Sequence, residues 1–228
     1  MVAQAYTVTY EKEQKPKLNG QLSQIKDPAI IKQLESRVIV TAYTLLHKDG
    51  TSNFLVPDQD NQERDKTLSL DNAQNKANVN VVKVGANPKT SVLYKDLSNK
   101  MFLKSSNLMG KEFLVKDTLT SYQWNLTDET KIIGNYVCKK AVATDKEKSI
   151  TAWYTPSIPI MDGPDQYFGL PGLIIELTDG NITYNALKVQ ETPDITIIKP
   201  STGKEITKAT YLKLRKERIE AIKQQFQN

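Results

Sequence analysis

The sequence WYTPSIPIMDGPDQYFGLPGLII, residues 153–175, decides how the rest of the chain is organised. It holds four prolines and three glycines among apolar and aromatic residues, so its backbone has restricted dihedral angles and is not a flexible linker. Leu170–Leu173 fits a type II turn, because proline presets the first central φ and glycine tolerates the positive φ of the second. The apolar run 173–177 that follows is typical of a strand buried on both faces.

The loop before that strand has a second predicted turn at 162–165 and an aromatic pair, Tyr167 and Phe168, which we expect to fill the core. We interpret the loop first as a folding element that delivers the chain into a central strand. The alternative is that it borders a ligand or partner site, with Asp162 and Asp165 facing solvent. The candidate binding residues are then Trp153, Tyr154, Asp162, Asp165, Tyr167 and Phe168.

Several blocks of the sequence resemble the GLPGLI family, whose naming motif matches residues 169–174. The other matching blocks, in family order, are Trp124–Leu126, Glu129–Ile132, Gly134–Ala141, Thr151–Thr155, Ile158–Ile160 and Gly163–Pro164. The resemblance implies an exported protein of Gram-negative bacteria, from a family often encoded beside outer-membrane receptors. Because the family has no established activity, the resemblance implies no catalytic residues.

Length and composition predict one domain spanning residues 1–228. A chain of 228 residues with 39% hydrophobic content can bury one substantial core. The stretch at about 57–78 is polar, and we interpret it as a loop excursion, because neither flank alone could enclose a core. No segment approaches the roughly 18 consecutive apolar residues of a membrane-spanning helix.

The pattern along the chain predicts an α+β fold that is predominantly antiparallel β, a curved meander sheet or partly open barrel. Residues 5–13 alternate with the period of a half-buried strand, and Asp49-Gly50 predicts a hairpin between 37–47 and 51–56. A short helix is expected near 28–36, with Asp27 as its N-cap. Further strands are expected at 79–84, 91–95, 101–104, 111–116, 121–127, 135–144, 148–155, 182–189 and 195–199.

A long C-terminal helix is expected near 207–226. One apolar face of it comprises Tyr211, Leu214, Ile219, Ile222 and Phe226. Laid across the sheet, it would create an apolar groove for an acyl chain or an extended peptide. Lysine and arginine line much of the remainder, which is typical of a solvated face; the alternative is peripheral contact with anionic lipid or an acidic partner.

The residues that could carry chemistry are few. His47 is the only histidine, and the sequence has no metal-ligand spacing, nucleophile elbow or cofactor fingerprint, so we expect no metal, no cofactor and no catalytic residue. Asp162 and Asp165 could act as a carboxylate pair or hold a hard cation, but such residues more often cap backbone amides. A hydrolase would need His47 beside one of them, or beside a nucleophile, in a cleft. Cys138 is interpreted as a small packed side chain.

These observations favour an exported, periplasmic or cell-envelope binding or carrier module of unknown ligand, associated with an outer-membrane receptor system. The partner would be a hydrophobic ligand or an envelope protein. The alternatives are a structural or interaction protein without a small-molecule site and, less favoured, a hydrolase. Residues 3–5, Ala-Gln-Ala, look like the end of a signal peptide, whereas a cytosolic protein would start at Met1. The net charge of +5 is spread along the chain, which argues against nucleic-acid binding.

Overall fold

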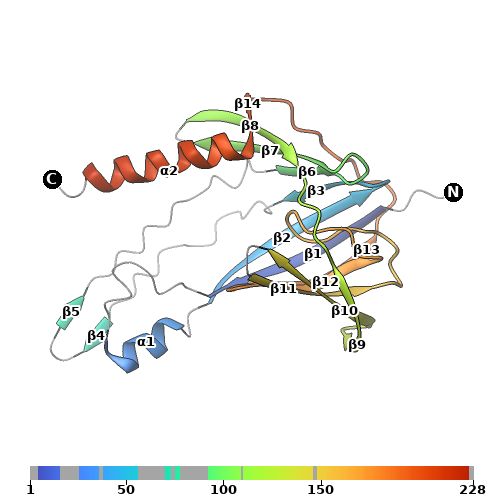
Figure 1. Cartoon of the computed structure of the whole chain (residues 1–228), viewed down its shortest axis with the longest axis horizontal. Coiled ribbons are helices and arrows are strands. Elements are labelled where there is room, and N and C mark those ends of the chain that lie inside the picture. Colours follow the sequence, from blue (N-terminus) through green and yellow to red (C-terminus); the bar gives the residue numbers. More distant parts are fainter. Residues whose placement is uncertain are drawn as a thin grey trace.

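The structure is a computed structural model, and it describes residues 5–15, 26–35, 38–55, 70–72, 75–77, 92–108, 110–145 and 148–225. Twelve strands form one curved sheet that does not close on itself (Figure 1). Its strands are β1 Ala5–Gln14, β2 Ile39–Lys48, β3 Thr51–Leu55, β6 Val92–Asp96, β7 Met101–Leu108, β8 Lys111–Thr118, β9 Asn125–Ile133, β10 Tyr136–Asp145, β11 Lys148–Thr155, β12 Leu173–Asp179, β13 Ile182–Glu191 and β14 Lys204–Ile206. The predicted fold class, mostly antiparallel β with a C-terminal helix, is confirmed.

The sheet consists of two antiparallel meanders joined by the first strand. The strand order is β14-β8-β7-β6-β3-β2-β1-β13-β12-β11-β10-β9. β1 lies between β2 and β13 and pairs antiparallel with both, so it connects the two halves of the chain. The exception is β14, which runs parallel to β8. The predicted Asp49-Gly50 hairpin is confirmed: β2 and β3 pair directly, and both turn residues have positive φ.

The segment predicted as a strand at 195–199 is not one; it crosses the sheet without joining a ladder. Its backbone is held by side chains instead, because Asn53 both donates to Ile198 O (2.8 Å) and accepts from Ile198 N (2.7 Å). Ile197 packs against a small buried cluster of Tyr94, Leu103 and Leu114. The isoleucines in 195–199, which favoured a strand in the sequence, therefore belong to a segment that packs on a face of the sheet and does not pair with a strand.

Two other strand predictions need revision. β9 begins at Asn125, so residues 121–124 are irregular rather than the start of a strand. The strand predicted at 79–84 lies outside the described residues. Within the polar excursion at 57–78, the described residues form a separate two-stranded pair, β4 Leu70–Asn72 and β5 Asn75–Ala77.

The short helix α1, Pro28–Glu35, forms as predicted. Its N-cap is Asp27, whose Oδ1 accepts hydrogen bonds from Ala29 N at 2.8 Å and Ile30 N at 3.4 Å. These bonds satisfy amide groups that have no partner inside the helix. The cap therefore fixes where the helix starts.

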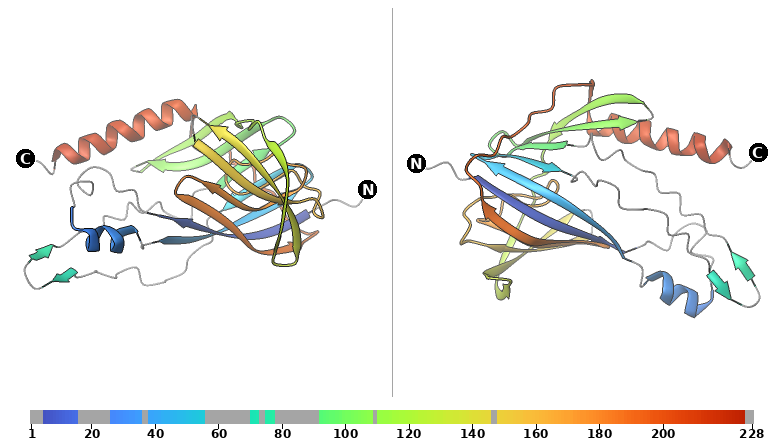
Figure 2. Two further views of the ribbon diagram at one scale, coloured as in Figure 1. Left: turned by 60° about the horizontal axis from the view of Figure 1, so that its bottom comes forward. Right: turned by 180° about the vertical axis from the view of Figure 1, so that it is seen from behind.

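The long helix α2, Lys208–Gln225, does not lie across the sheet, so the predicted groove beneath it is wrong for the described residues. Its first turn contacts the sheet at β7 and β8. Lys208 N donates to Asp117 Oδ2, and Tyr211 packs edge-on against Phe113, both on β8. The Tyr211 hydroxyl also lies 2.6 Å from Ser106 Oγ on β7. Beyond that contact the helix extends away from the strands (Figures 1 and 2). Ile219 is 42% exposed, because none of the described strands comes near enough to cover it.

The interior of the curved sheet is filled by the chain itself. Strand side chains from both meanders meet in one apolar cluster, including Val8, Leu45 and Phe102. The loop between β11 and β12, residues 156–172, adds its own buried side chains to the same cluster: Ile158, Ile160, Tyr167, Phe168 and Leu170. We call these five residues the loop plug. Tyr167 and Phe168 thus fill the core as predicted.

Candidate functional site

The loop enters β12 through a corner at Leu170, Pro171 and Gly172. Gly172 N donates to Leu170 O at 2.8 Å, which is the contact of a γ-turn centred on Pro171, so the predicted type II turn is wrong. Gly172 has φ of 149°, and a Cβ there would lie 2.2 Å from Thr155 O. Glycine is therefore required by its backbone angle and by the close approach of another strand's backbone.

β12 itself lies inside the sheet, between β11 and β13, as predicted. Its first amides are paired by the loop: Leu173 N donates to Ile158 O and Ile174 N donates to Asp162 O, both at 3.0 Å. On the other side, Tyr10 of β1 donates its hydroxyl to Ile174 O at 2.5 Å. The loop is consequently a hydrogen-bonded part of the sheet's core.

A buried charged cluster lies where this loop meets the other half of the sheet. Asp162 accepts from Lys95 Nζ at its Oδ1 (2.5 Å), and its Oδ2 lies 2.8 Å from His47 Nδ1. Lys95 Nζ also donates to Gly163 O at 2.7 Å, and Gly163 N donates to Asp162 Oδ1 at 2.8 Å. Asp162 and Lys95 are 0% exposed and His47 is 3% exposed.

The strand register explains why these side chains meet. His47 of β2 pairs with Ser52 of β3, and Ser52 pairs with Lys95 of β6, so all three lie on one face of the sheet. Ser52 is fully buried, and its hydroxyl has no hydrogen-bond partner among the described residues. The cluster is thus a polar row across three strands with Asp162 against it.

The electrostatics of the cluster favour an ionised aspartate. Burial alone would raise the pKa of Asp162, but the Lys95 charge and the His47 hydrogen bond outweigh it and hold the pKa well below its usual range. Burial also raises the pKa of the nearby Tyr10 well above its ordinary value, and the Asp162 charge adds to that effect. An ionised Asp162 thus compensates the buried lysine.

The cluster meets one of the two requirements of the hydrolase hypothesis, a histidine beside a carboxylate, but not the other, a cleft. His47 is within hydrogen-bonding distance of Asp162, as that hypothesis requires. However, the cluster is enclosed by protein instead of lining a cleft. The alternative in which Asp162 faces solvent is therefore wrong. Asp162 bonds to Lys95, His47 and the Gly163 amide, so it caps a backbone amide, as the favoured interpretation expected.

The six candidate binding residues do not form one site. Tyr154, Tyr167 and Phe168 are buried, and Tyr167 donates its hydroxyl to Asp179 Oδ2 at 2.7 Å. Asp165 is half-buried, in a turn at φ of 50°. Trp153 alternates with buried core residues of β11 and lies among charged side chains, with Lys131 Nζ 4.4 Å from its ring centroid.

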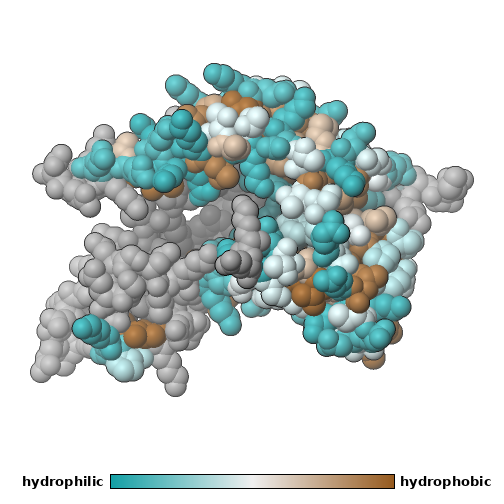
Figure 3. Space-filling view, in the orientation of Figure 1, coloured by the Kyte–Doolittle hydropathy of each residue, from teal (hydrophilic) through white to brown (hydrophobic). Residues whose placement is uncertain are grey.

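Several apolar side chains near the Leu170–Gly172 corner are exposed to solvent. Ile132 is 76% exposed, and its cross-strand partner Val137 is 61% exposed, at the tip of the β9–β10 hairpin. Thr155 Oγ1 donates to Val137 O at 3.0 Å, which ties this tip to the start of the loop. Three prolines of the loop are also exposed. We call Ile132, Val137, Pro156, Pro159 and Pro171 the apolar rim. Figure 3 shows apolar surface over the part of the molecule where Figure 1 places β9 to β12.

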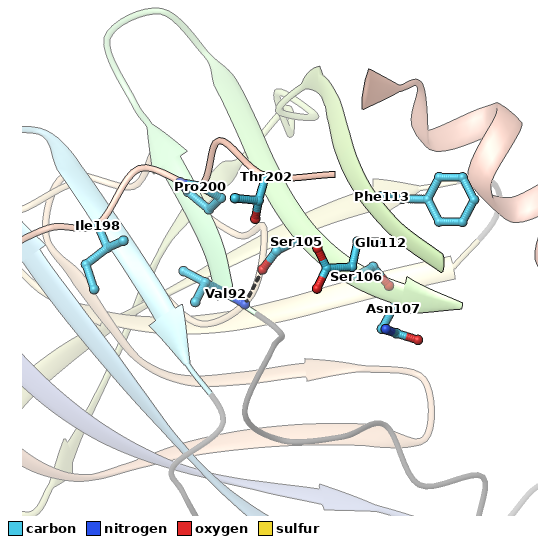
Figure 4. A pocket seen from close by; sticks show the side chains of 9 residues that line it. All are labelled: Val92, Ser105, Ser106, Asn107, Glu112, Phe113, Ile198, Pro200 and Thr202. Carbon is cyan, nitrogen blue, oxygen red and sulfur yellow. Dashed lines mark hydrogen bonds between the residues drawn. The ribbon is translucent and has the colours of Figure 1, made fainter. Parts of the chain in front are cut away.

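A small hollow lies on another part of the sheet, beside the segment that crosses β6 to β8 (Figure 4). Its volume is about 250 Å³, and it is lined by Val92, Ser105, Ser106, Asn107, Glu112, Phe113, Ile198, Pro200 and Thr202. Ser106 Oγ lies 2.6 Å from the Tyr211 hydroxyl, and Ser105 Oγ accepts from Val92 N. None of the predicted binding residues reaches this hollow.

Lys95 is the functional-site residue that the sequence analysis missed. Its signal is a lysine within a short strand, two residues after Leu93, so that the two side chains lie on the same face of the sheet. Both are buried. Among the described residues, no cluster of three or more histidine, cysteine, aspartate or glutamate side chains has the arrangement of a metal site. No described helix combines the length and apolar character needed to cross a membrane.

Comparison with known proteins gives a limited family match and a fold match. Residues 143–176 match the model of a family described as "Protein of unknown function (Porph_ging)". The matched segment is 34 of the 228 residues, and the match does not confirm the GLPGLI name. No curated protein matches the chain.

Two solved structures resemble the fold. They are titled "Structure of PNGF-II in C2 space group" (TM-score 0.57, 15% identity) and "Structure of PNGF-II in P21 space group" (TM-score 0.56, 16% identity). Each comparison covers 92% of this chain but 32% of the PNGF-II chain, so this chain spans about a third of that protein. At these identities the likeness concerns the fold alone.

Proposed function

We propose that this chain is an exported binding module of the bacterial cell envelope whose partner is another protein, bound at the apolar rim. The observation that carries the proposal is the loop plug, which occupies the interior of the curved sheet. A carrier of a hydrophobic ligand needs an apolar cavity of several hundred Å³. In the described part of the chain, the side chains that would line such a cavity pack against one another instead.

The apolar rim has properties of a docking surface. Exposed apolar side chains that lie together on a folded protein commonly mark contact sites. Three of the five rim residues are prolines, and the corner behind them is fixed by the Gly172 approach to Thr155. Because proline has a fixed φ, ordering the proline part of the rim on binding costs little conformational entropy.

Export to the periplasm or cell envelope, and association with an outer-membrane receptor system, are supported by the resemblance of the sequence to the GLPGLI family. Fractionation of the source cells tests the location. We expect the protein in the periplasmic or membrane-associated fraction, and recovery with cytosolic markers would contradict export.

The rim is tested by charged substitutions in the full chain. We expect Ile132→Asp combined with Val137→Asp to abolish the complex formed in the source envelope, because a partner's apolar surface would have to bury two carboxylates. The matched control is Leu187→Asp, since Leu187 is 62% exposed on β13, which β12 and β11 separate from the β9–β10 hairpin.

The measurement is the molar mass of the extracted complex by light scattering after size-exclusion chromatography. A complex that is lost with the rim variant and retained with the Leu187 control supports the proposal. A complex that survives the rim variant, or a wild-type protein that is always a bare monomer, contradicts it.

A further inference from the structure

The buried contact between Lys95 and Asp162 has the geometry of two groups that can react. Both side chains are 0% exposed, and they come from positions 67 residues apart. Lys95 Nζ lies 2.5 Å from Asp162 Oδ1, so the carboxyl carbon is one bond further away. A primary amine and a carboxyl group held together away from water are the reactants of an amide.

We propose that Lys95 and Asp162 condense to form an intramolecular isopeptide bond between Nζ of Lys95 and Cγ of Asp162, with release of one water molecule. The dry surroundings favour this product. A buried ammonium and a buried carboxylate each carry a large desolvation cost, whereas an amide carries no net charge. Excluding bulk water also removes the solvent that would drive hydrolysis of the bond.

The reaction starts from the ionised pair. The proton in the Nζ–H···Oδ1 hydrogen bond moves to the carboxylate, which gives a neutral amine and a neutral acid. The amine lone pair then attacks Cγ and forms the C–N bond. Because Oδ1 now carries the transferred proton, negative charge develops on Oδ2, where His47 Nδ1, 2.8 Å away, can donate a hydrogen bond to it.

The leaving oxygen is Oδ1, which also lies 2.8 Å from the Gly163 amide nitrogen. The attacking nitrogen gives a second proton to the Oδ1 hydroxyl, the Cγ–Oδ1 bond breaks to release water, and Oδ2 becomes the amide oxygen. Of the three protons on Nζ, two leave with Oδ1 as water and one stays on the amide nitrogen. The buried Ser52 hydroxyl, which has no other described partner, lies on the strand between His47 and Lys95 and can bind the released water.

The bond would join β6 to the loop that precedes β12. It would therefore close a covalent ring across the two meanders and hold the loop plug against the sheet. The bond would restrict the unfolded chain as a disulfide does in other proteins. The 228 residues contain one cysteine, Cys138, so they offer no pair of cysteines for that purpose.

The test is the intact mass of the full chain under denaturing conditions. We expect a mass 18 Da below that calculated from the sequence, and a protease digest that contains one branched peptide joining Lys95 to Asp162. The full sequence mass in folded protein would overturn the proposal.

A cyclic imide at Asp162-Gly163 would also lose 18 Da, so a variant must distinguish the two products. Lys95→Arg keeps a cation beside Asp162 but has no reactive amine, and we expect it to show its full sequence mass. Persistence of the loss in Lys95→Arg would overturn the proposal. If that variant does not fold, the wild-type digest decides, because an imide yields only linear peptides.

The role of His47 has its own readout. We expect His47→Ala to form the bond about 100-fold more slowly after refolding, as followed by the appearance of the lighter mass, because the hydrogen bond to the charge developing on Oδ2 is lost. An unchanged rate would show that His47 does not take part. Full sequence mass in wild type at all times would refute the bond itself.

Discussion

The corner at Gly172 makes the sharpest stability prediction. In Gly172→Ala the new Cβ would lie 2.2 Å from Thr155 O and 3.0 Å from Pro156 Cα, at a φ of 149°. The φ alone costs about 1–3 kcal/mol for a residue with a side chain. The contact adds about 1–3 kcal/mol, because the atoms it meets belong to the backbone and cannot rotate away. We expect a loss of about 4 kcal/mol in the free energy of unfolding.

Gly180→Ala is the matched control. Gly180 also has positive φ, 59°, but a Cβ there would meet nothing within 4 Å. Its cost is the left-handed conformation alone, about 1–2 kcal/mol. The assay is urea denaturation of both variants beside the wild type, with the m-value checked for constancy. Equal losses in the two variants would refute the argument that the corner is fixed by close approach to β11.

Three further predictions follow from buried or paired groups. Burial raises the pKa of the Cys138 thiol to about 11, so at pH 8 a thiol reagent should label the native protein at least ~100-fold more slowly than the urea-unfolded chain; comparable rates would contradict this. Burial raises the pKa of Tyr10 and raises that of Tyr122 to about 12, whereas unfolded tyrosine ionises near pH 10. The free energy of unfolding that these two tyrosines contribute is therefore fully present below pH 10 and is lost as the pH rises further. We expect the urea midpoint to fall above pH 10, and a midpoint that stays constant to pH 11 would contradict this. Asn53→Ala removes both hydrogen bonds to the Ile198 backbone and should cost about 2 kcal/mol in urea denaturation, with no loss if the crossing segment is held by packing alone.

The elements that the sequence predicted correctly are those determined by neighbouring residues. The Asp49-Gly50 hairpin, the Asp27 cap and the strand after Gly172 each depend on residues within a few positions of one another. The core role of Tyr167 and Phe168 could also be predicted, because two large rings between turns in an apolar loop need burial.

The contacts that the sequence could not predict join distant positions. Lys95 and Asp162 are 67 residues apart, and Asn53 and Ile198 are 145 residues apart, so no local pattern relates them. The apolar face expected on the long helix indicated a preference for burial but not a direction of packing, and α2 leaves the sheet after its first turns. The burial of Asp162 depends on Lys95, which lies on β6, so residues near Asp162 in the sequence could not decide between a surface carboxylate and a buried one.

The central claim is that the sheet's interior holds the chain's own loop plug and that the protein therefore binds a partner from outside. Native mass spectrometry of the protein purified from its own envelope tests this most directly. The predicted spectrum contains an added polypeptide mass that disappears when Ile132 and Val137 are replaced by aspartate. A retained lipid or other hydrophobic small molecule at one-to-one stoichiometry, unaffected by those substitutions, would contradict it.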